Sequence, residues 1–117
     1  MQKREAKLQI RFKHWLQSVG WSQNAAFELK NSKTNTLPKG SLKEHQRQAL
    51  WNAKHSMLYH KIADTSYTPL PFDSFILSSA HAYIVVQFPL GVVMIDIDDY
   101  GEPLHYERAI KIGKRIF

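Results

Sequence analysis

Cysteine is absent from this chain of 117 residues. Disulfide bridges, thiolate zinc sites and cysteine nucleophiles are therefore excluded, and stability must come from a hydrophobic core. No run approaches the roughly 18 to 20 consecutive apolar residues that a membrane span requires. The first residues also lack the apolar centre of a signal peptide. We therefore expect one domain over residues 1–117, with no membrane association and a cytoplasmic location.

Basic residues are missing from one long stretch of the chain. Residues 62–105 contain no lysine or arginine, whereas residues 1–61 contain 12 of them against 3 acidic residues. The net charge of the whole chain is +6. This basic half fits a polyphosphate partner, because Lys and Arg release counterions from a phosphate backbone. A solvated basic surface is the alternative interpretation.

Familiar enzyme signatures are missing as well. The chain has neither the G-x-S-x-G motif of serine hydrolases nor the G-x-x-x-x-G-K-[ST] phosphate loop. Its histidines show no pair with zinc-type spacing, since His55 and His60 are separated by an expected element boundary. Serine hydrolase, phosphate-loop and zinc chemistry are therefore not expected.

Hydrophobic periodicity of three and four residues predicts a helix at residues 2–18, which Gly20 ends. Glu5 is an exception to this pattern. It is a charged residue, but its spacing places it on the apolar face of the helix, which points inward, and not on the face that points to solvent. The apolar members of that face are Leu8, Phe12, Trp15, Leu16 and Val19.

Alternation predicts a strand at residues 25–30. Phe27 and Leu29 point to one side of it, so Glu28 and Lys30 share the other side. A carboxylate and an ammonium group are thus expected next to each other on one face of a sheet.

A polar loop at residues 31–40 shows no pattern of a regular element. A helix is expected after it, with Ser41 as its cap and Glu44 completing a capping box. Gln46 falls within the apolar stripe of this helix. Burying an unpaired amide costs roughly 1 to 3 kcal/mol, so we expect this side chain to have partners.

Alternation of apolar and polar residues predicts mainly strands in the second half of the chain. Residues 57–64 alternate, and residues 71–77, 82–88 and 91–97 are expected to form an antiparallel run. The final block, residues 105–117, suits both a helix and a strand.

These elements carry the parts of a metal-dependent phosphodiesterase. Carboxylate oxygens hold Mg²⁺ or Mn²⁺, which polarises the scissile phosphate and lowers the pKa of a bound water. A nearby lysine positions that water and offsets phosphate charge. An ordinary ion pair between Glu28 and Lys30 on the surface of a strand is the alternative interpretation of the triplet.

The segment FELKNSKTNTLPKGSLKEHQRQAL, residues 27–50, resembles the core of RecU-type Holliday junction resolvases, members of the PD-(D/E)xK nuclease superfamily. In that family a strand ending in Glu-x-Lys precedes a Thr/Lys-rich loop, a turn and a helix with a Glu-His-Gln signature. The matching features here are Glu28 to Lys30, Lys33 to Thr36, Leu37-Pro38 and Glu44-His45-Gln46. The resemblance implies a restriction-endonuclease-like α/β fold, a central mixed β-sheet flanked by helices.

The resemblance also implies roles for individual residues. Glu5 on the first helix and Glu28 would hold the metal, because the family's first helix contributes a glutamate to that site. Lys30 would act at the water and the phosphate, and Gln46 would orient the site.

One feature departs from the family pattern. The superfamily usually places an aspartate shortly before the Glu-x-Lys strand, but residues 17–27 contain no acid. Asp73 is the best replacement as a catalytic residue and metal ligand, although a strand-edge aspartate is the alternative. Asp96 and Asp98 share a strand face that suits a cation, yet a strand end with its turn is the favoured interpretation.

The resemblance implies a Mg²⁺-dependent, structure-selective endonuclease, with Mn²⁺ as the alternative metal, that cuts branched DNA as a homodimer. Two alternatives stay open: a non-catalytic DNA-binding protein on the same fold, and a PD-(D/E)xK endonuclease of restriction, homing or repair type acting on linear duplex. The residues expected to contact DNA phosphates are Arg4, Lys7, Arg11, Lys33, Lys39, Lys43 and Arg47.

The tryptophans divide into two groups. Trp15 belongs to the inward stripe of the first helix and is expected in the core. Trp21 and Trp51 are the better candidates for exposure. An exposed tryptophan stacks on nucleic acid bases or marks a subunit interface.

Overall fold

The computed structural model describes residues 3–55, 58–61, 74–77 and 80–117, with side chains described for 6–55 and 80–117. None of the helices in these ranges is long and apolar enough to cross a membrane. The elements, in chain order, are α1 (Lys3–Ser18), β1 (Ala25–Asn31), β2 (Thr36–Leu37), α2 (Glu44–His55), β3 (Leu58–Lys61), β4 (Ser74–Leu77), β5 (His81–Phe88), β6 (Gly91–Asp96), β7 (Leu104–His105), α3 (Tyr106–Ile112) and β8 (Lys114–Arg115).

A mixed four-stranded sheet forms the centre of the molecule, with the strand order β1-β5-β6-β8. β1 and β5 are parallel, and Ala25 lies opposite His81. β5 and β6 are antiparallel, as are β6 and β8. A mixed sheet with helices was expected, and β1 lies at one end of its strand order.

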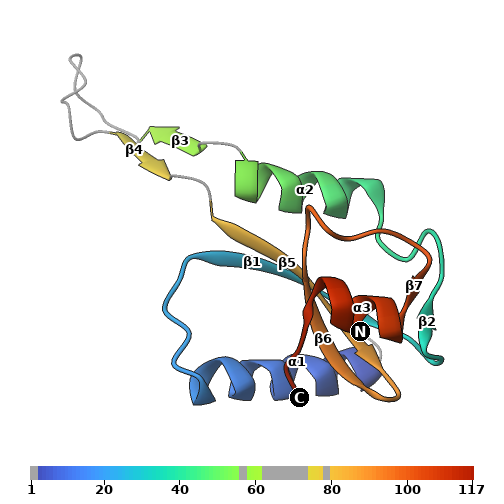
Figure 1. Ribbon diagram of the computed structural model, residues 1–117. Coiled ribbons are helices and arrows are strands. Elements are labelled where there is room, and N and C mark those ends of the chain that lie inside the picture. The colour runs from blue at the N-terminus through green and yellow to red at the C-terminus, as the bar shows by residue number, and fades with distance from the viewer. Residues whose placement is uncertain (1–2, 56–57, 62–73, 78–79) are drawn as a thin grey trace.

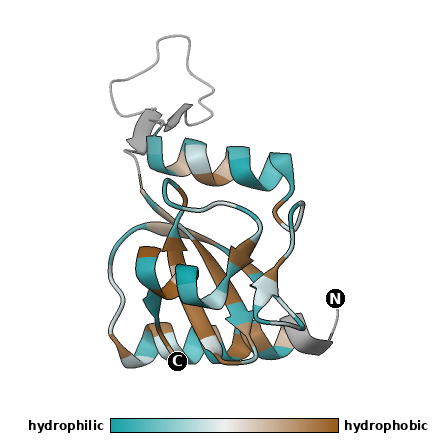
Figure 2. Ribbon diagram, turned by 45° about the vertical axis from the view of Figure 1, so that its right-hand side comes forward, coloured by the Kyte–Doolittle hydropathy of each residue, from teal (hydrophilic) through white to brown (hydrophobic). Residues whose placement is uncertain are grey.

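Helices cover both faces of this sheet (Figure 1). α1 covers one face through Leu8 and Phe12, which pack with Val85 and Val92. α2 and α3 lie on the opposite face, where a larger buried cluster joins Leu37, Leu42, Leu50, Ile84, Val86, Val93, Ile95, Leu104 and Ala109. Figure 2 shows hydrophobic residues concentrated on the central strands. Each fully buried aliphatic side chain contributes about 1.5–3 kcal/mol, so these two clusters hold the layers together.

The predicted first helix is confirmed as α1, but its inward stripe is one residue shorter than expected. Val19 follows the last residue of α1 and is 52% exposed. Gly20 adopts a φ of +64°, a conformation that glycine reaches without strain, and turns the chain away from the helix. The turn carries Val19 out of the packed face.

The expected antiparallel run of three strands is wrong for its first member. β4 pairs with β3 and not with β5. The reason lies in β5, whose two edges are occupied by β1 and β6. Residues 71–73 of that predicted strand lie outside the described residues.

Two further segments differ from their patterns. The loop at 31–40 contains β2, which pairs with β7 and buries Leu37 to 2% exposure. The final block, which suited both helix and strand, forms α3 and then β8. The backbone of Gly113 between them lies so close to Met94 that an added Cβ would stand 2.4 Å from the Met94 carbonyl oxygen.

Candidate functional site

β1 presents Glu28 and Lys30 side by side on one face of the sheet. Phe27 and Leu29 alternate with them and pack against the α1 cluster on the other face. The Lys30 Nζ lies 3.7 Å from the Glu28 Oε1, with the two side chains 17% and 31% exposed. The shared face expected from the sequence is therefore present, and both groups are partly withdrawn from water.

Gln46 of α2 connects these two side chains. Its Nε2 donates a hydrogen bond to the Glu28 Oε1 at 3.1 Å. Its Oε1 accepts one from the Lys30 Nζ at 2.9 Å. An amide group offers one acceptor and one donor end, and here each end meets the residue of opposite character. The inward-facing glutamine is partly buried and has the partners that were expected for it.

The amide of Gln46 also caps its own helix. Its Oε1 accepts a hydrogen bond from the Lys43 backbone N–H at 3.0 Å. The predicted capping box of Ser41 and Glu44 is wrong, because α2 begins at Glu44 and the Ser41 hydroxyl bonds instead to the Pro38 carbonyl at 2.6 Å. Gln46 is three residues after the N-cap position, from which a long polar side chain reaches back to the first turn.

A polar pocket of about 260 Å³ opens over this network. It lies at the end of the strand order, between α1 and α2, because β1 has a strand partner on one side only among the described residues. The lining residues are Gln9, Phe27, Glu28, Leu29, Lys30 and Gln46. The pocket combines an acceptor, a cation and two amide groups, which is a set that suits a phosphate and its bound water.

Two predicted metal ligands lie outside the described side chains. Glu5 is on α1, one turn before Gln9, but only its backbone is described. Asp73 is not among the described residues, and the same holds for the side chain of Arg4. Their proposed roles stay predictions.

The described residues contain no group of three or more His, Asp or Glu side chains that converge to hold a metal ion. Glu28 is the carboxylate that lines the pocket. Mg²⁺ usually keeps several waters and is held by one or two carboxylates together with substrate phosphates. A single described carboxylate beside an open polar pocket fits that mode of binding, with Glu28 as the ligand.

The predicted DNA-contacting residues fall on two sides of the pocket. Lys7 and Arg11 are exposed on α1, where the Arg11 guanidinium lies 4.8 Å from the centre of the Phe117 ring. The other four are exposed along the loop after β1 and on the start of α2, namely Lys33, Lys39, Lys43 and Arg47. The loop itself is held in place by Ser32, whose hydroxyl lies 2.7 Å from the Thr34 carbonyl oxygen.

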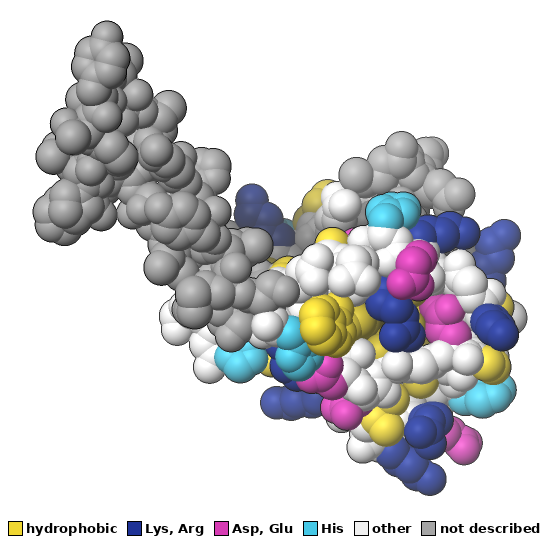
Figure 3. All heavy atoms as spheres, turned by 90° about the horizontal axis from the view of Figure 1, so that it is seen from above, with side chains coloured by type: hydrophobic (Ala, Val, Ile, Leu, Met, Phe, Trp, Pro, Cys, Tyr) yellow, Lys and Arg dark blue, Asp and Glu magenta, His cyan; other side chains and the backbone are white. Residues whose placement is uncertain are grey.

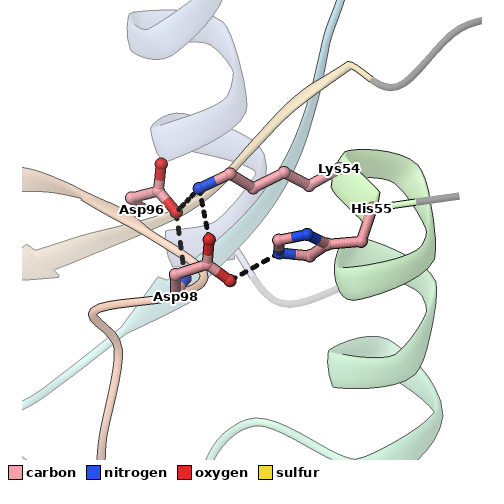
Figure 4. Close-up of polar contacts among 4 residues, drawn as sticks. All are labelled: Lys54, His55, Asp96 and Asp98. Atoms are coloured by element: carbon pink, nitrogen blue, oxygen red, sulfur yellow. Dashed lines mark hydrogen bonds and ion pairs between the residues drawn. The ribbon is translucent and has the colours of Figure 1, made fainter.

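A second polar cluster joins the end of α2 to the turn after β6 (Figure 4). The sequence analysis named its two aspartates, Asp96 and Asp98, but missed their contacts with the end of α2. The Lys54 Nζ lies 2.7 Å from an Asp96 oxygen and 2.5 Å from an Asp98 oxygen. The His55 Nε2 lies 2.7 Å from the other Asp98 oxygen. β6 ends at Asp96 and Asp98 lies in the turn, so the turn interpretation of this acidic segment is confirmed.

These contacts shift two pKa values in opposite directions. The hydrogen bonds that Lys54 donates to Asp96 and then to Asp98 raise the pKa of Lys54 to about 12. Hydrogen bonds from Lys54 and then His55 lower the pKa of Asp98 below its ordinary value. Each group is therefore held in its charged form. No local sequence pattern connects a lysine with acidic residues about 40 positions away. Opposite charge was the only feature of the sequence that could have indicated this contact.

Glu102 was also missed, although it holds the loop that leads into α2. Its Oε1 accepts the Gly40 N–H at 2.7 Å and its Oε2 accepts the Leu42 N–H at 2.8 Å. The Tyr100 hydroxyl donates to the same carboxylate. Burial, and then this hydrogen bond, raise the pKa of Tyr100 above its ordinary value. We refer to Glu102 and its two amide contacts as the loop clamp.

The tryptophans differ partly from expectation. Trp21 is half-buried among aromatic rings, with ring centres 5.5 Å from Phe27 and 5.9 Å from Tyr83, so its predicted exposure is wrong. Trp51 is 47% exposed, as expected.

Comparisons with protein-family models, with curated proteins and with solved structures find no match to this chain. The fold and the site described above therefore carry the functional reasoning by themselves.

Proposed function

We propose that the protein is a Mg²⁺-dependent endonuclease that hydrolyses phosphodiester bonds in branched DNA, similar to Holliday junction resolvases. The observation that carries the proposal is the pocket in which Gln46 links Glu28 and Lys30. The resemblance of residues 27–50 to the resolvase core agrees with it and rests on the same three residues.

Each member of the network has a chemical task in this proposal. When Mg²⁺ is bound, it supplies a Lewis acid that polarises the scissile phosphate and acidifies a water. Glu28 would hold the ion. Lys30 would orient the attacking water and offset the charge that develops on the phosphate. Gln46 bonds to both groups and fixes the ammonium and the carboxylate 3.7 Å apart on the pocket wall.

The surrounding charge supports a nucleic acid substrate. Lys33 and Lys39 are exposed in the loop after β1, and Lys43 and Arg47 are exposed around the start of α2, the two segments that follow Glu28 and Lys30 and that carry Gln46. Their contacts with phosphates release counterions and provide affinity that does not depend on sequence. A branched substrate presents two symmetry-related strands for cutting, so we also propose a homodimer, which matches that symmetry. The cytoplasmic location expected from the composition suits an enzyme of this kind.

The test is a cleavage assay on labelled four-way junctions and linear duplexes of matched length, with Mg²⁺, Mn²⁺ or EDTA. We expect paired metal-dependent nicks near the branch point, which Glu28→Gln and Lys30→Met abolish. Glu44→Gln is the matched control, because Glu44 is an exposed carboxylate on α2 that does not line the pocket. Equal cutting of both DNAs would instead identify a nuclease of linear duplex.

A second candidate is a DNA-binding protein without nuclease activity. The observation in its favour is that the described residues bring one carboxylate, that of Glu28, into the pocket. Tight junction binding without cleavage in either metal would support it. Asp73→Asn adds a further test, since loss of cleavage in this variant would identify the missing second carboxylate.

A further inference from the structure

The outward side of α2 carries a row of four exposed side chains, which we call the α2 ridge. It begins at Lys43, just before the helix, and continues at every fourth residue with Arg47, Trp51 and His55. Residues spaced by four lie above one another on a helix surface. The ridge therefore has a basic end beside the pocket and an aromatic end away from it.

The aromatic end forms a small platform. The ring centres of Trp51 and His55 are 4.7 Å apart and the rings are inclined by 32°. A hollow of about 340 Å³ lies beside them, lined by Arg47, Gln48 and Trp51. Figure 3, which views the molecule from the α2 side, shows hydrophobic surface bordered by histidine and by Lys and Arg side chains. Trp51 is thus exposed next to a cation and a second ring.

The polar cluster at the end of α2 fixes this platform. The Asp98 Oδ1 holds the His55 Nε2 at 2.7 Å, while the Lys54 Nζ bonds to the other oxygen of the same carboxylate. His55 is thereby held against Trp51 before any ligand arrives, which reduces the entropy lost on binding. Lys54 also offsets the negative charge of Asp98. The nearby acids therefore repel a phosphate chain less than their number suggests.

We propose that the α2 ridge binds an unpaired nucleobase of the substrate, with the base stacked on Trp51 and its adjoining phosphates at Arg47 and Lys43. Exposed aromatic rings beside basic groups recognise single-stranded nucleic acid in this way. The proposal rests on the proposed function for the identity of the ligand as DNA. It deepens that function, because base pairs beside a branch point lose stacking continuity and are the most easily opened.

The platform and the pocket lie on different sides of the same helix. Gln46, which lines the pocket, is five residues before Trp51. This separation corresponds to a rise of about 7.5 Å along the helix axis and a rotation of about 140° around it. A strand whose phosphate enters the pocket would therefore pass around the start of α2 to reach Trp51, where Lys43 and Arg47 are exposed.

The experiment measures binding of a short fluorescent oligothymidylate in EDTA, where no metal-dependent cleavage takes place. Trp51→Ala is expected to weaken binding roughly tenfold, which is the effect of losing one base–aromatic stack. Trp51→Phe keeps a ring and is expected to retain most of the affinity. Leu90→Ala is the matched control, because Leu90 is a large apolar residue that is 56% exposed elsewhere on the molecule. Urea unfolding of each variant shows whether the fold is intact.

Unchanged affinity in a folded Trp51→Ala variant would overturn the proposal. So would a loss of dimer in size-exclusion chromatography with unchanged affinity, which would make the ridge a contact between two copies of the chain. The two proposals fail in different ways. Junction cleavage with no effect of Trp51 on binding removes the ridge alone, whereas Trp51-dependent binding without any cleavage removes the nuclease alone.

Discussion

Gln46 occupies a central place in the pocket because both ends of its amide group are used. The oxygen accepts from an ammonium group and from a backbone N–H, and the nitrogen donates to a carboxylate. Neither Glu28 nor Lys30 is fully exposed. Removing the amide would leave these two charges to pair directly or to remain unsatisfied, and both outcomes change the site.

We expect Gln46→Leu to destabilise the protein by about 1–3 kcal/mol, because a buried network and a helix cap are lost together. The same variant should lose most of its cleavage activity. Urea unfolding measures the first effect and single-turnover cleavage the second. Gln17→Leu is the control, since Gln17 is an exposed glutamine on α1 that lines neither the pocket nor the hollow beside Trp51. A Gln46→Leu variant with full activity would show that the network has no part in catalysis.

Asp98 gives a prediction about pH. Its pKa is lowered from an ordinary value of 3.8, chiefly by the hydrogen bond from Lys54. Asp98 therefore binds a proton more readily in the unfolded chain than in the folded protein. Its contact with Lys54 stabilises the fold at pH values above the ordinary pKa of 3.8. That contribution is lost as the pH falls below about 4. The advantage of wild type over Asp98→Asn in urea unfolding should shrink over this range.

Asp99→Asn serves as the neighbouring control for this measurement. Asp99 is exposed, and the described residues offer its carboxylate no ion pair. Its substitution should leave the pH dependence of unfolding unchanged. If the difference between wild type and Asp98→Asn stayed constant down to the lowest pH at which the protein folds, the ion pair would not form in solution.

At the scale of elements, α2 depends on contacts from a distant part of the chain. The loop clamp at Glu102 holds the Gly40 and Leu42 amides in the segment that leads into the helix. Lys54 and His55 are held to the turn after β6 at the other end. Both ends of the helix that carries Gln46 are therefore fixed by the second half of the chain.

Glu102→Ala is expected to cost roughly 2 kcal/mol or more in stability, because two charge-assisted hydrogen bonds are lost, one of them to the amide of the buried Leu42. Amide hydrogen exchange at Gly40 and Leu42 should speed up in this variant. Glu107→Ala, a change at an exposed glutamate on α3, should leave both amides protected. Unchanged exchange in Glu102→Ala would mean that other contacts hold the loop.

The sequence predicted the elements whose signal is local. α1 and β1 follow from spacing along a single segment, and the shared face of Glu28 and Lys30 follows from the pleat of a strand. The start of α2 was predicted wrongly because the Ser41 hydroxyl bonds to the Pro38 carbonyl and the helix begins only at Glu44. Tertiary contacts decided the outcome, since Glu102 and Gln46 bind the backbone amides of this segment.

The remaining features depend on pairing between distant segments, which a single sequence does not encode as a pattern. β4 pairs with β3 because both edges of β5 are occupied. The contacts of Lys54 with Asp96 and Asp98 join segments that have no common periodicity. Trp21 was expected to be exposed, but it meets Tyr83 of a strand far along the chain.

At the scale of the whole molecule, the basic half of the sequence, residues 1–61, contains α1, the loop after β1 and α2. Lys33 lies in the loop after β1, at one end of the sheet, and Lys114 lies in β8 at the other end. Both side chains are exposed and carry the same charge. They therefore form a matched pair for testing which end of the sheet contacts DNA.

We expect Lys33→Ala to weaken junction binding and to reduce the slope of log affinity against log salt by about 0.9, the value for one lost phosphate contact. Lys114→Ala should leave both quantities unchanged. Titrations at several salt concentrations in EDTA provide the measurement. Identical slopes for wild type and Lys33→Ala would exclude this loop from the DNA surface.

The parallel pairing of β1 with β5 has a consequence for protein synthesis. Glu28, Lys30 and Gln46 leave the ribosome early, but β1 acquires its hydrogen-bonded neighbour only when His81–Phe88 has been made. Such distant pairing closes a long loop and is slow compared with local structure. A nascent chain that already contains all three residues will therefore lack the pocket until translation has passed β5. Under the proposed function, an unfinished polypeptide of this protein would thus be unable to cut DNA.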